Sequence, residues 1–118
     1  MKYICLIYAD ENGMASAPEE SKSVIDAYWK FEEDIGKAGI KVAGEGLQPT
    51  QSAKTVQVTD GQTVATDGPF AETKEQLGGF YLIEVKDEAE AIRWAAKIPT
   101  AAIGGRVEVR PCMVFDQE

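Results

Sequence analysis

Lys2-Tyr3-Ile4-Cys5-Leu6-Ile7-Tyr8 carries apolar side chains on both faces of an extended chain. Successive side chains of a strand point to opposite sides, so Tyr3, Cys5 and Ile7 share one face and the alternate residues share the other. Residues 77–85 repeat this two-sided pattern: Leu77-Gly78-Gly79-Phe80-Tyr81-Leu82-Ile83-Glu84-Val85. Both segments are therefore expected to be strands that are covered on both faces.

Two helices are expected beside these strands. The first begins at Ser16-Ala17-Pro18-Glu19, which has the spacing of a capping box, and it ends at Gly39. Its apolar residues recur every three or four positions, at Val24, Tyr28, Phe31, Ile35 and Ala38. The second helix begins with the same capping spacing at Asp87 and Glu90, and Pro99 is expected to end it.

The remaining β-rich segments complete the predicted order of strands and helices along the chain. Residues 40–47 and 106–115 are expected to be strands, and residues 55–59 and 62–66 form a hairpin around the turn Asp60-Gly61. The order is thus βαβ, hairpin, βαβ. It predicts one α+β domain over residues 1–118, with a ferredoxin-like βαββαβ core and an inserted β-hairpin.

Two helices can cover only one face of a four-stranded sheet. The other face would then expose a large apolar surface, which is unusual on a monomer. A second copy of the chain is the simplest cover, because two-fold dimers are the commonest oligomers. The sequence therefore predicts a homodimer that forms through the sheet face.

Charge and residue content exclude several classes of function. The net charge of −8 over 118 residues disfavours nucleic acid and anionic membrane surfaces as partners. The apolar run near residue 2 is too short for a membrane span, so a cytoplasmic location is expected. The chain has two cysteines and no histidine, so neither a structural zinc site nor a Ser-His-Asp triad is expected within it. No metal or other cofactor is assigned.

Four segments resemble the DGPF branch of the YCII-related family: Gly44-Glu45-Gly46-Leu47, Thr66-Asp67-Gly68-Pro69-Phe70-Ala71-Glu72-Thr73-Lys74-Glu75, Gly78-Gly79-Phe80-Tyr81 and Val107-Glu108-Val109-Arg110-Pro111. The resemblance covers nearly the whole chain, from Met1 to Phe115. It implies a ferredoxin-like fold that dimerises through its sheets into an α+β barrel.

The resemblance implies less about function. Families with this fold include muconolactone isomerases, chloromuconolactone dehalogenases and antibiotic-biosynthesis monooxygenases. Other YCII-like proteins are proposed to use a His-Asp pair, which this chain cannot form because it has no histidine. Some DGPF proteins resemble partners of extracytoplasmic-function sigma factors, which implies a regulatory context.

Two carboxylates are the candidate catalytic residues. Asp67, before Gly68-Pro69, could act as a general base if burial raised its pKa. The alternative for Asp67 is an Asx turn, in which its side chain accepts backbone hydrogen bonds. Glu45 could be the second acid–base group, or it could pair with Lys41 or with an arginine on a neighbouring strand.

Four further residues are candidates for binding a substrate. Tyr8 and Phe70 could position a ligand, although both could instead pack in the core or at a dimer interface. Arg110 and Lys74 could stabilise an anion. Their alternatives are a cross-strand or intersubunit ion pair for Arg110 and a solvated turn for Lys74.

Two functions from different classes fit these residues. The first is a metal-free enzyme-like domain that binds a small organic acid or lactone and performs proton transfer, isomerisation or elimination. The alternative is a non-catalytic dimeric binding or regulatory module, linked to extracytoplasmic-function sigma factors. A cofactor-free oxygenase is a third hypothesis. The enzyme hypothesis requires an enclosed cavity touched by two or more of Asp67, Glu45, Tyr8 and Arg110.

Overall fold

The computed structural model describes residues 1–11 and 18–115 of the chain. Its core is a four-stranded sheet in the order β2-β5-β1-β6, in which every neighbouring pair is antiparallel. The strands are β1 (Lys2–Ala9), β2 (Lys41–Gly46), β5 (Gln76–Glu84) and β6 (Arg106–Pro111). This order places the two oily strands β1 and β5 at the centre, and it confirms the predicted ferredoxin-like α+β fold.

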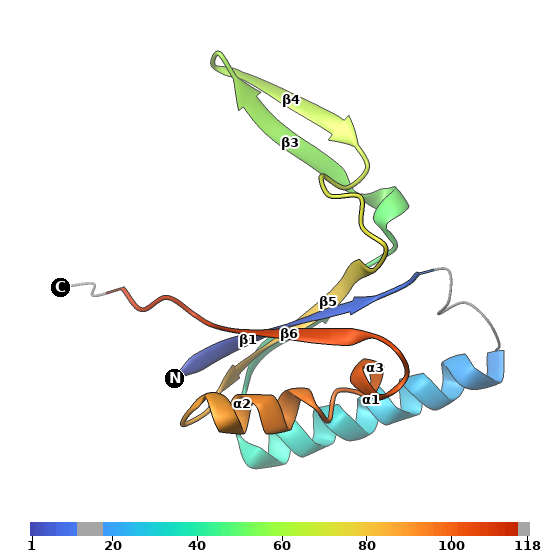
Figure 1. Cartoon of the computed structure of the whole chain (residues 1–118), viewed down its shortest axis with the longest axis vertical. Coiled ribbons are helices and arrows are strands. Elements are labelled where there is room, and N and C mark those ends of the chain that lie inside the picture. The colour runs from blue at the N-terminus through green and yellow to red at the C-terminus, as the bar shows by residue number, and fades with distance from the viewer. Residues whose placement is uncertain (12–17, 116–118) are drawn as a thin grey trace.

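The helices lie together on one side of the sheet (Figure 1). They are α1 (Pro18–Ala38), α2 (Glu88–Ala95) and α3 (Pro99–Ala102). Asp87 caps α2 by accepting a hydrogen bond from the Glu90 backbone N–H at 2.9 Å, as the capping spacing predicts. The predicted cap at Ser16 lies outside the described residues.

Within the described residues, two predicted boundaries differ from the structure by more than one residue. The second helix ends at Ala95, and Pro99 begins α3, because proline is well tolerated at the first helical position. The last strand ends at Pro111 and does not continue to Phe115. The Cys112 N–H still bonds to the carbonyl of Lys2, but β1 begins at that residue. Residues beyond Cys112 therefore have no further length of β1 to pair with.

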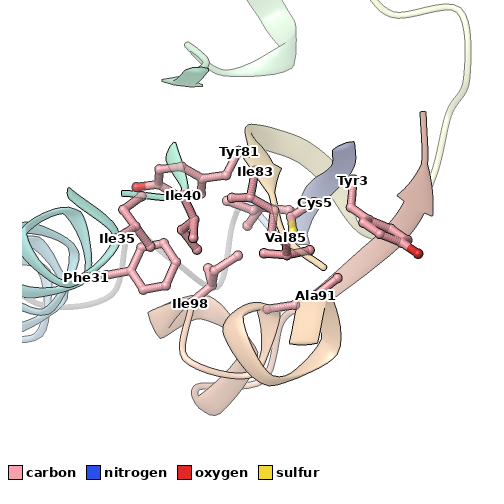
Figure 2. Close-up of a cluster of buried hydrophobic side chains, with 12 residues drawn as sticks. Tyr3, Cys5, Phe31, Ile35, Ile40, Tyr81, Ile83, Val85, Ala91 and Ile98 are labelled. Atoms are coloured by element: carbon pink, nitrogen blue, oxygen red, sulfur yellow. The ribbon is translucent and has the colours of Figure 1, made fainter. Parts of the chain in front are cut away.

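The hydrophobic core fills the layer between the helices and one face of the sheet (Figure 2). Tyr3, Cys5 and Ile83 are supplied by the sheet, and Phe31 and Ile35 by α1. The rings of Phe31 and Tyr81 meet edge to face, with centroids 5.0 Å apart. Ile35 and Ile83 have 0% and 1% of their surface exposed, so this layer is closely packed.

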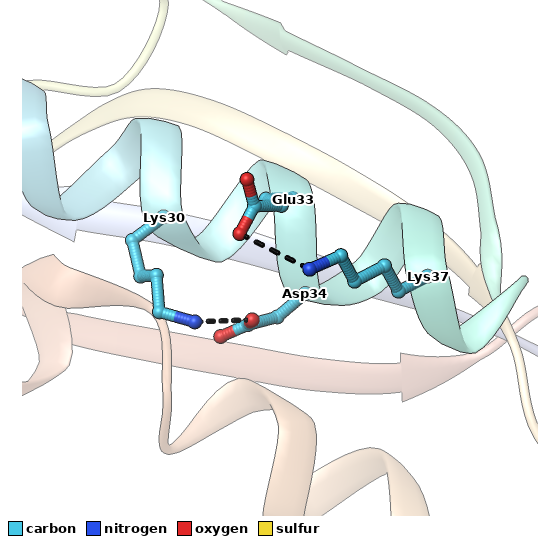
Figure 3. Close-up of polar contacts among 4 residues, drawn as sticks. All are labelled: Lys30, Glu33, Asp34 and Lys37. Atoms are coloured by element: carbon cyan, nitrogen blue, oxygen red, sulfur yellow. Dashed lines mark hydrogen bonds and ion pairs between the residues drawn. The ribbon is translucent and has the colours of Figure 1, made fainter.

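One side of α1 carries two ion pairs (Figure 3). Lys30 pairs with Asp34 at 2.7 Å, and Lys37 pairs with Glu33 at 3.5 Å. Both pairs are four residues apart, so they lie along one exposed side of the helix. Such exposed pairs contribute little to stability.

The face of the sheet that no helix covers has an apolar centre and charged edges. We call it the open face. Its centre is Ile4 and Leu6 of β1, which lie opposite Leu82 and Phe80 of β5. All four side chains are half-buried within one chain. The register places these charged residues around them: Lys2, Glu45, Glu84, Arg106, Glu108 and Arg110.

The inserted hairpin forms a separate two-stranded sheet of β3 (Lys54–Thr59) and β4 (Gln62–Asp67). Its turn residues Asp60 and Gly61 have φ values of 50° and 78°, as the predicted Asp-Gly turn requires. A short 3₁₀ turn, η2 (Thr50–Ser52), precedes it. Figure 1 shows the hairpin projecting away from the sheet on the side opposite the helices.

Candidate functional site

A pocket of about 670 Å3 lies between α1 and the end of the sheet where β2 stops and β5 starts. Its wall combines apolar residues, four glycines and several polar groups. The lining residues are Ile7, Ala9, Glu11, Tyr28, Glu32, Gly44, Glu45, Gly46, Leu47, Pro49, Gln76, Gly78, Gly79, Tyr81 and Thr100. This volume is in the range that holds a small organic molecule.

Glycines create the space for the pocket. Gly46 lies opposite Gly79 in the β2–β5 register, and Gly79 lies opposite Ile7 on the helix-covered face. Gly46 and Gly79 carry no side chain that would project from the sheet toward α1. A Cβ atom at Gly46 would meet nothing within 4 Å, whereas a Cβ atom at Gly44 would come within 2.6 Å of the Tyr81 ring. The glycines therefore leave a hollow over Gly46 and let Tyr81 lie against the backbone of β2.

A hydrogen-bonded chain of three side chains crosses one wall of the pocket. The Tyr81 hydroxyl donates to Glu32 at 2.7 Å, and the Lys41 ammonium donates to the same carboxylate at 2.6 Å. Burial acts to raise the pKa of Glu32, but these two hydrogen bonds and the charge of Lys41 together outweigh it and hold that pKa below its ordinary value. Burial and the Glu32 charge both raise the pKa of Tyr81, so its hydroxyl stays protonated.

Two further polar contacts frame the pocket. The hydroxyls of Tyr28 and Thr100 lie 2.6 Å apart, and burial raises the pKa of Tyr28 more than this contact lowers it. Glu11 accepts hydrogen bonds from the Thr50 backbone N–H at 2.7 Å and from its hydroxyl at 2.8 Å. The Glu11 N–H in turn bonds to Gln76 at 3.0 Å. These contacts hold the β1, η2 and β5 sides of the pocket together.

The lowered pKa of Glu32 predicts a pH dependence of stability. Its ion pair stabilises the fold above the ordinary carboxyl pKa of 4.5, and this contribution is lost as the pH falls through the lower folded value. We expect Glu32→Gln to reduce the free energy of unfolding at about pH 7, and the gap from the wild type to shrink at about pH 3.5. Urea denaturation at both pH values measures this gap.

Glu33→Gln is the matched control, because Glu33 neighbours Glu32 and pairs with Lys37 at 3.5 Å on the exposed side of α1. We expect a small effect of Glu33→Gln at both pH values. If the difference in free energy of unfolding between Glu32→Gln and the wild type grew as the pH fell, it would contradict the assignment of Glu32 as an ionised, paired carboxylate.

The candidate residues from the sequence do not gather into one site within a single chain. The side chain of Asp67 is 88% exposed at the end of β4 and pairs with Lys54. Phe70 is 88% exposed, and Lys74 is exposed in the same loop. Tyr8 lies on β1 opposite Arg106 of β6, and Arg110 pairs with Glu108 at 2.7 Å.

Glu45 is the one candidate that belongs to the pocket wall. It lies opposite Phe80, so alternation along β2 places its side chain on the open face. Among the described residues, no group of three or more carboxylates and cysteines is arranged to hold a metal ion. Within the same residues, no helix is long and apolar enough to cross a membrane.

Sequence reasoning did not select Glu11, Tyr28, Glu32, Tyr81 or Thr100 as site residues. Tyr28 was interpreted only as part of the apolar stripe of α1. The signal that could have found the pocket was the pairing of two glycine-rich segments, residues 44–46 and 78–79, on strands expected to be neighbours. Aligned glycines on a covered sheet face leave a volume that neighbouring helices must either fill or leave open.

Comparison with known proteins agrees with the resemblance in the sequence. The family model of the YCII-related domain matches residues 1–116. A curated protein of Rhizobium meliloti (strain 1021), described as uncharacterized, is 37% identical over 117 residues, which cover 98% of this chain and 94% of that protein. The match extends over the sheet, the helices and the inserted hairpin alike. The chain therefore belongs to the YCII-related family.

Proposed function

We propose that this protein is a dimeric domain that binds a small organic molecule in the pocket between α1 and the sheet. The observation that carries the proposal is the hollow over Gly46, which lies in a pocket lined by four glycines, beside an otherwise closely packed core. Proteins usually fill such volumes with side chains. Here apolar walls surround a few fixed hydroxyl and carboxylate groups, which is the usual composition of a ligand site.

The charge of the pocket favours a neutral or cationic ligand. The carboxylates of Glu11 and Glu32 belong to its wall, and no Lys or Arg is among the described lining residues. The nearby Lys41 is already paired with Glu32. An organic acid would face repulsion from these carboxylates, so a lactone or another neutral molecule fits better than the acid considered from the sequence.

The same groups favour binding over proton transfer. A general base works best with a pKa near the operating pH, and the pKa of Glu32 is shifted in the opposite direction. Tyr81 is held protonated and is already a donor to Glu32. Asp67, the first catalytic candidate, is exposed and paired with Lys54. We therefore favour the binding module over the enzyme-like domain.

A thermal-shift screen with a pocket-filling variant tests this proposal. Lactones, amines and carboxylic acids of similar size would be compared on the wild type. We expect a neutral or cationic compound to raise the melting temperature by about 5 °C at saturation. Gly46→Leu should abolish the shift, because a Cβ atom at Gly46 meets nothing within 4 Å and the rest of the leucine side chain would then occupy the hollow.

Gly36→Leu is the matched control, because Gly36 lies on α1 outside the pocket and a Cβ atom there also meets nothing within 4 Å. This variant should keep the full ligand-induced shift. Equal shifts in Gly46→Leu and the wild type would place the binding elsewhere. Shifts produced by carboxylic acids alone would contradict the charge argument.

We also propose that two copies associate through their open faces. Although the chain carries a net charge of −8, the open face is balanced, with Lys2, Arg106 and Arg110 against Glu45, Glu84 and Glu108. Two such faces can approach without the repulsion that other surfaces of this acidic chain would produce. An apolar centre inside a charged rim is also the usual anatomy of an interface.

A further inference from the structure

The β3–β4 hairpin, residues 54–67, is an arm with one apolar face. Val56 lies opposite Ala65, and Val58 lies opposite Thr63, so these four residues share one face. Val56 and Val58 are 62% and 67% exposed. The other face is polar apart from Val64: Thr55, Gln57, Thr59, Gln62 and Thr66. Such alternation is typical of a strand pair whose apolar face contacts another surface.

Within the described part of its own chain, the apolar face of the arm packs against no other element. The elements of the main sheet and the helices pack against one another, whereas β3 and β4 pack chiefly against each other. A two-stranded hairpin alone is marginally stable in water. The exposed valines and the exposed edges of both strands therefore favour a contact with another molecule.

The root of the arm is fastened to the body. The Leu47 N–H bonds to the carbonyl of Gly78 at 2.8 Å, and Glu11 accepts two hydrogen bonds from Thr50. At the base of the arm, the Gly68 N–H bonds to the carbonyl of Ala53 at 2.8 Å, which joins the two ends of the hairpin to each other. The bonds of Leu47 and Thr50 hold the segment that leads into the arm against the body, and the arm leaves the sheet on the side opposite the helices.

The arm extends on the open-face side of the sheet, where a second copy would lie in the proposed dimer. Figure 1 shows the helices on one side of the sheet and the arm rising on the other. The chain measures 51 × 48 × 19 Å and Figure 1 looks along the short dimension, so this separation is not an effect of overlap. Six residues of strand span about 20 Å, whereas two packed sheets lie about 10 Å apart. The arm is therefore long enough to extend beyond the spacing between two packed sheets and to reach the partner subunit.

We propose that the arm of each copy docks on the other copy, with Val56, Val58 and Ala65 against the partner subunit. This proposal rests on the open-face dimer of the proposed function and adds a second contact to it. We infer that the partner of the arm is a second copy of this chain, because the arm extends from the open-face side of the sheet and the hydrogen bonds at its root hold the segment that leads into it against the body. Two-fold symmetry then gives two equivalent arm contacts per dimer.

Sedimentation equilibrium of two matched double variants tests the arm. Val56→Asp/Val58→Asp places two charges on the apolar face, and Gln57→Asp/Thr59→Asp places two charges on the opposite face of the same strand. We expect the first to raise the dimer dissociation constant about 100-fold and the second to change it about threefold or less. Equal effects of the two variants would overturn the arm contact and leave the open-face dimer intact.

Hydrogen exchange of the wild-type protein provides a readout that does not depend on how the variants fold. Amides of residues 55–66 should be protected in the dimer, because an undocked hairpin opens readily. The protection should disappear at protein concentrations where the dimer dissociates. Fast exchange of these amides in an intact dimer would overturn the proposal. A wild type that is monomeric would instead contradict the open-face dimer itself and the arm contact with it.

Discussion

Leu6→Glu is expected to convert the protein from a dimer into a folded monomer, raising the dissociation constant at least about 1,000-fold. Leu6 lies at the centre of the open face, opposite Phe80 and Glu108 on the neighbouring strands. In a dimer the new carboxylate would be buried against the partner subunit without a counter-charge. Within one chain position 6 is half-buried on the open face, so a glutamate there can extend its carboxylate into water and the fold should survive.

Ile92→Glu is the matched control for Leu6→Glu. It makes the same change in charge and also replaces an aliphatic side chain, but Ile92 is 53% exposed on α2, on the opposite side of the sheet. We expect it to keep the dissociation constant of the wild type. Sedimentation equilibrium measures both variants, and far-UV circular dichroism verifies that they are folded. A dimeric Leu6→Glu protein would place the interface on another surface.

Ile35→Ala is expected to lower the free energy of unfolding by about 2–5 kcal/mol. Ile35 has 0% of its surface exposed, and Figure 2 shows it beside Phe31 and Ile40 in the core. Truncation removes buried methyl groups and leaves a cavity that a closely packed layer cannot fill. A loss of this size is a large part of the stability of an ordinary domain.

Ile25→Ala, on the same helix, is the control for Ile35→Ala. Ile25 is 55% exposed, so we expect its truncation to change the free energy of unfolding by about 0.5 kcal/mol or less. Urea denaturation at one fixed protein concentration compares the two variants, which removes the concentration dependence of a dimer. Equal losses would contradict the assignment of the core side of α1.

The fold could be predicted because local signals agreed with one another. The two-sided strands at residues 2–8 and 77–85, the Asp-Gly turn and the Asp87 cap all act over a few residues, and each is present in the structure. The boundaries that failed depend on distant partners. The last strand ends near Pro111 because β1 begins at Lys2, and nothing within residues 106–115 encodes that limit.

The candidate site was harder to predict because residue chemistry alone does not place side chains together. Asp67 and Phe70 stand out in the sequence, yet both are exposed in the structure. Glu32 did not stand out, because its partners Lys41 and Tyr81 lie 9 and 49 residues further along the chain. Only the sheet register brings Gly46 opposite Gly79 and opens the pocket beneath α1.

The pairing of two open faces is the central claim, because the arm contact depends on it. Light scattering of the wild-type protein across the micromolar concentration range measures it most directly. We expect a mass of twice the 12.8 kDa of one chain. A mass of one chain throughout that range would contradict it, and would show that the apolar centre around Leu6 and Phe80 is left in water.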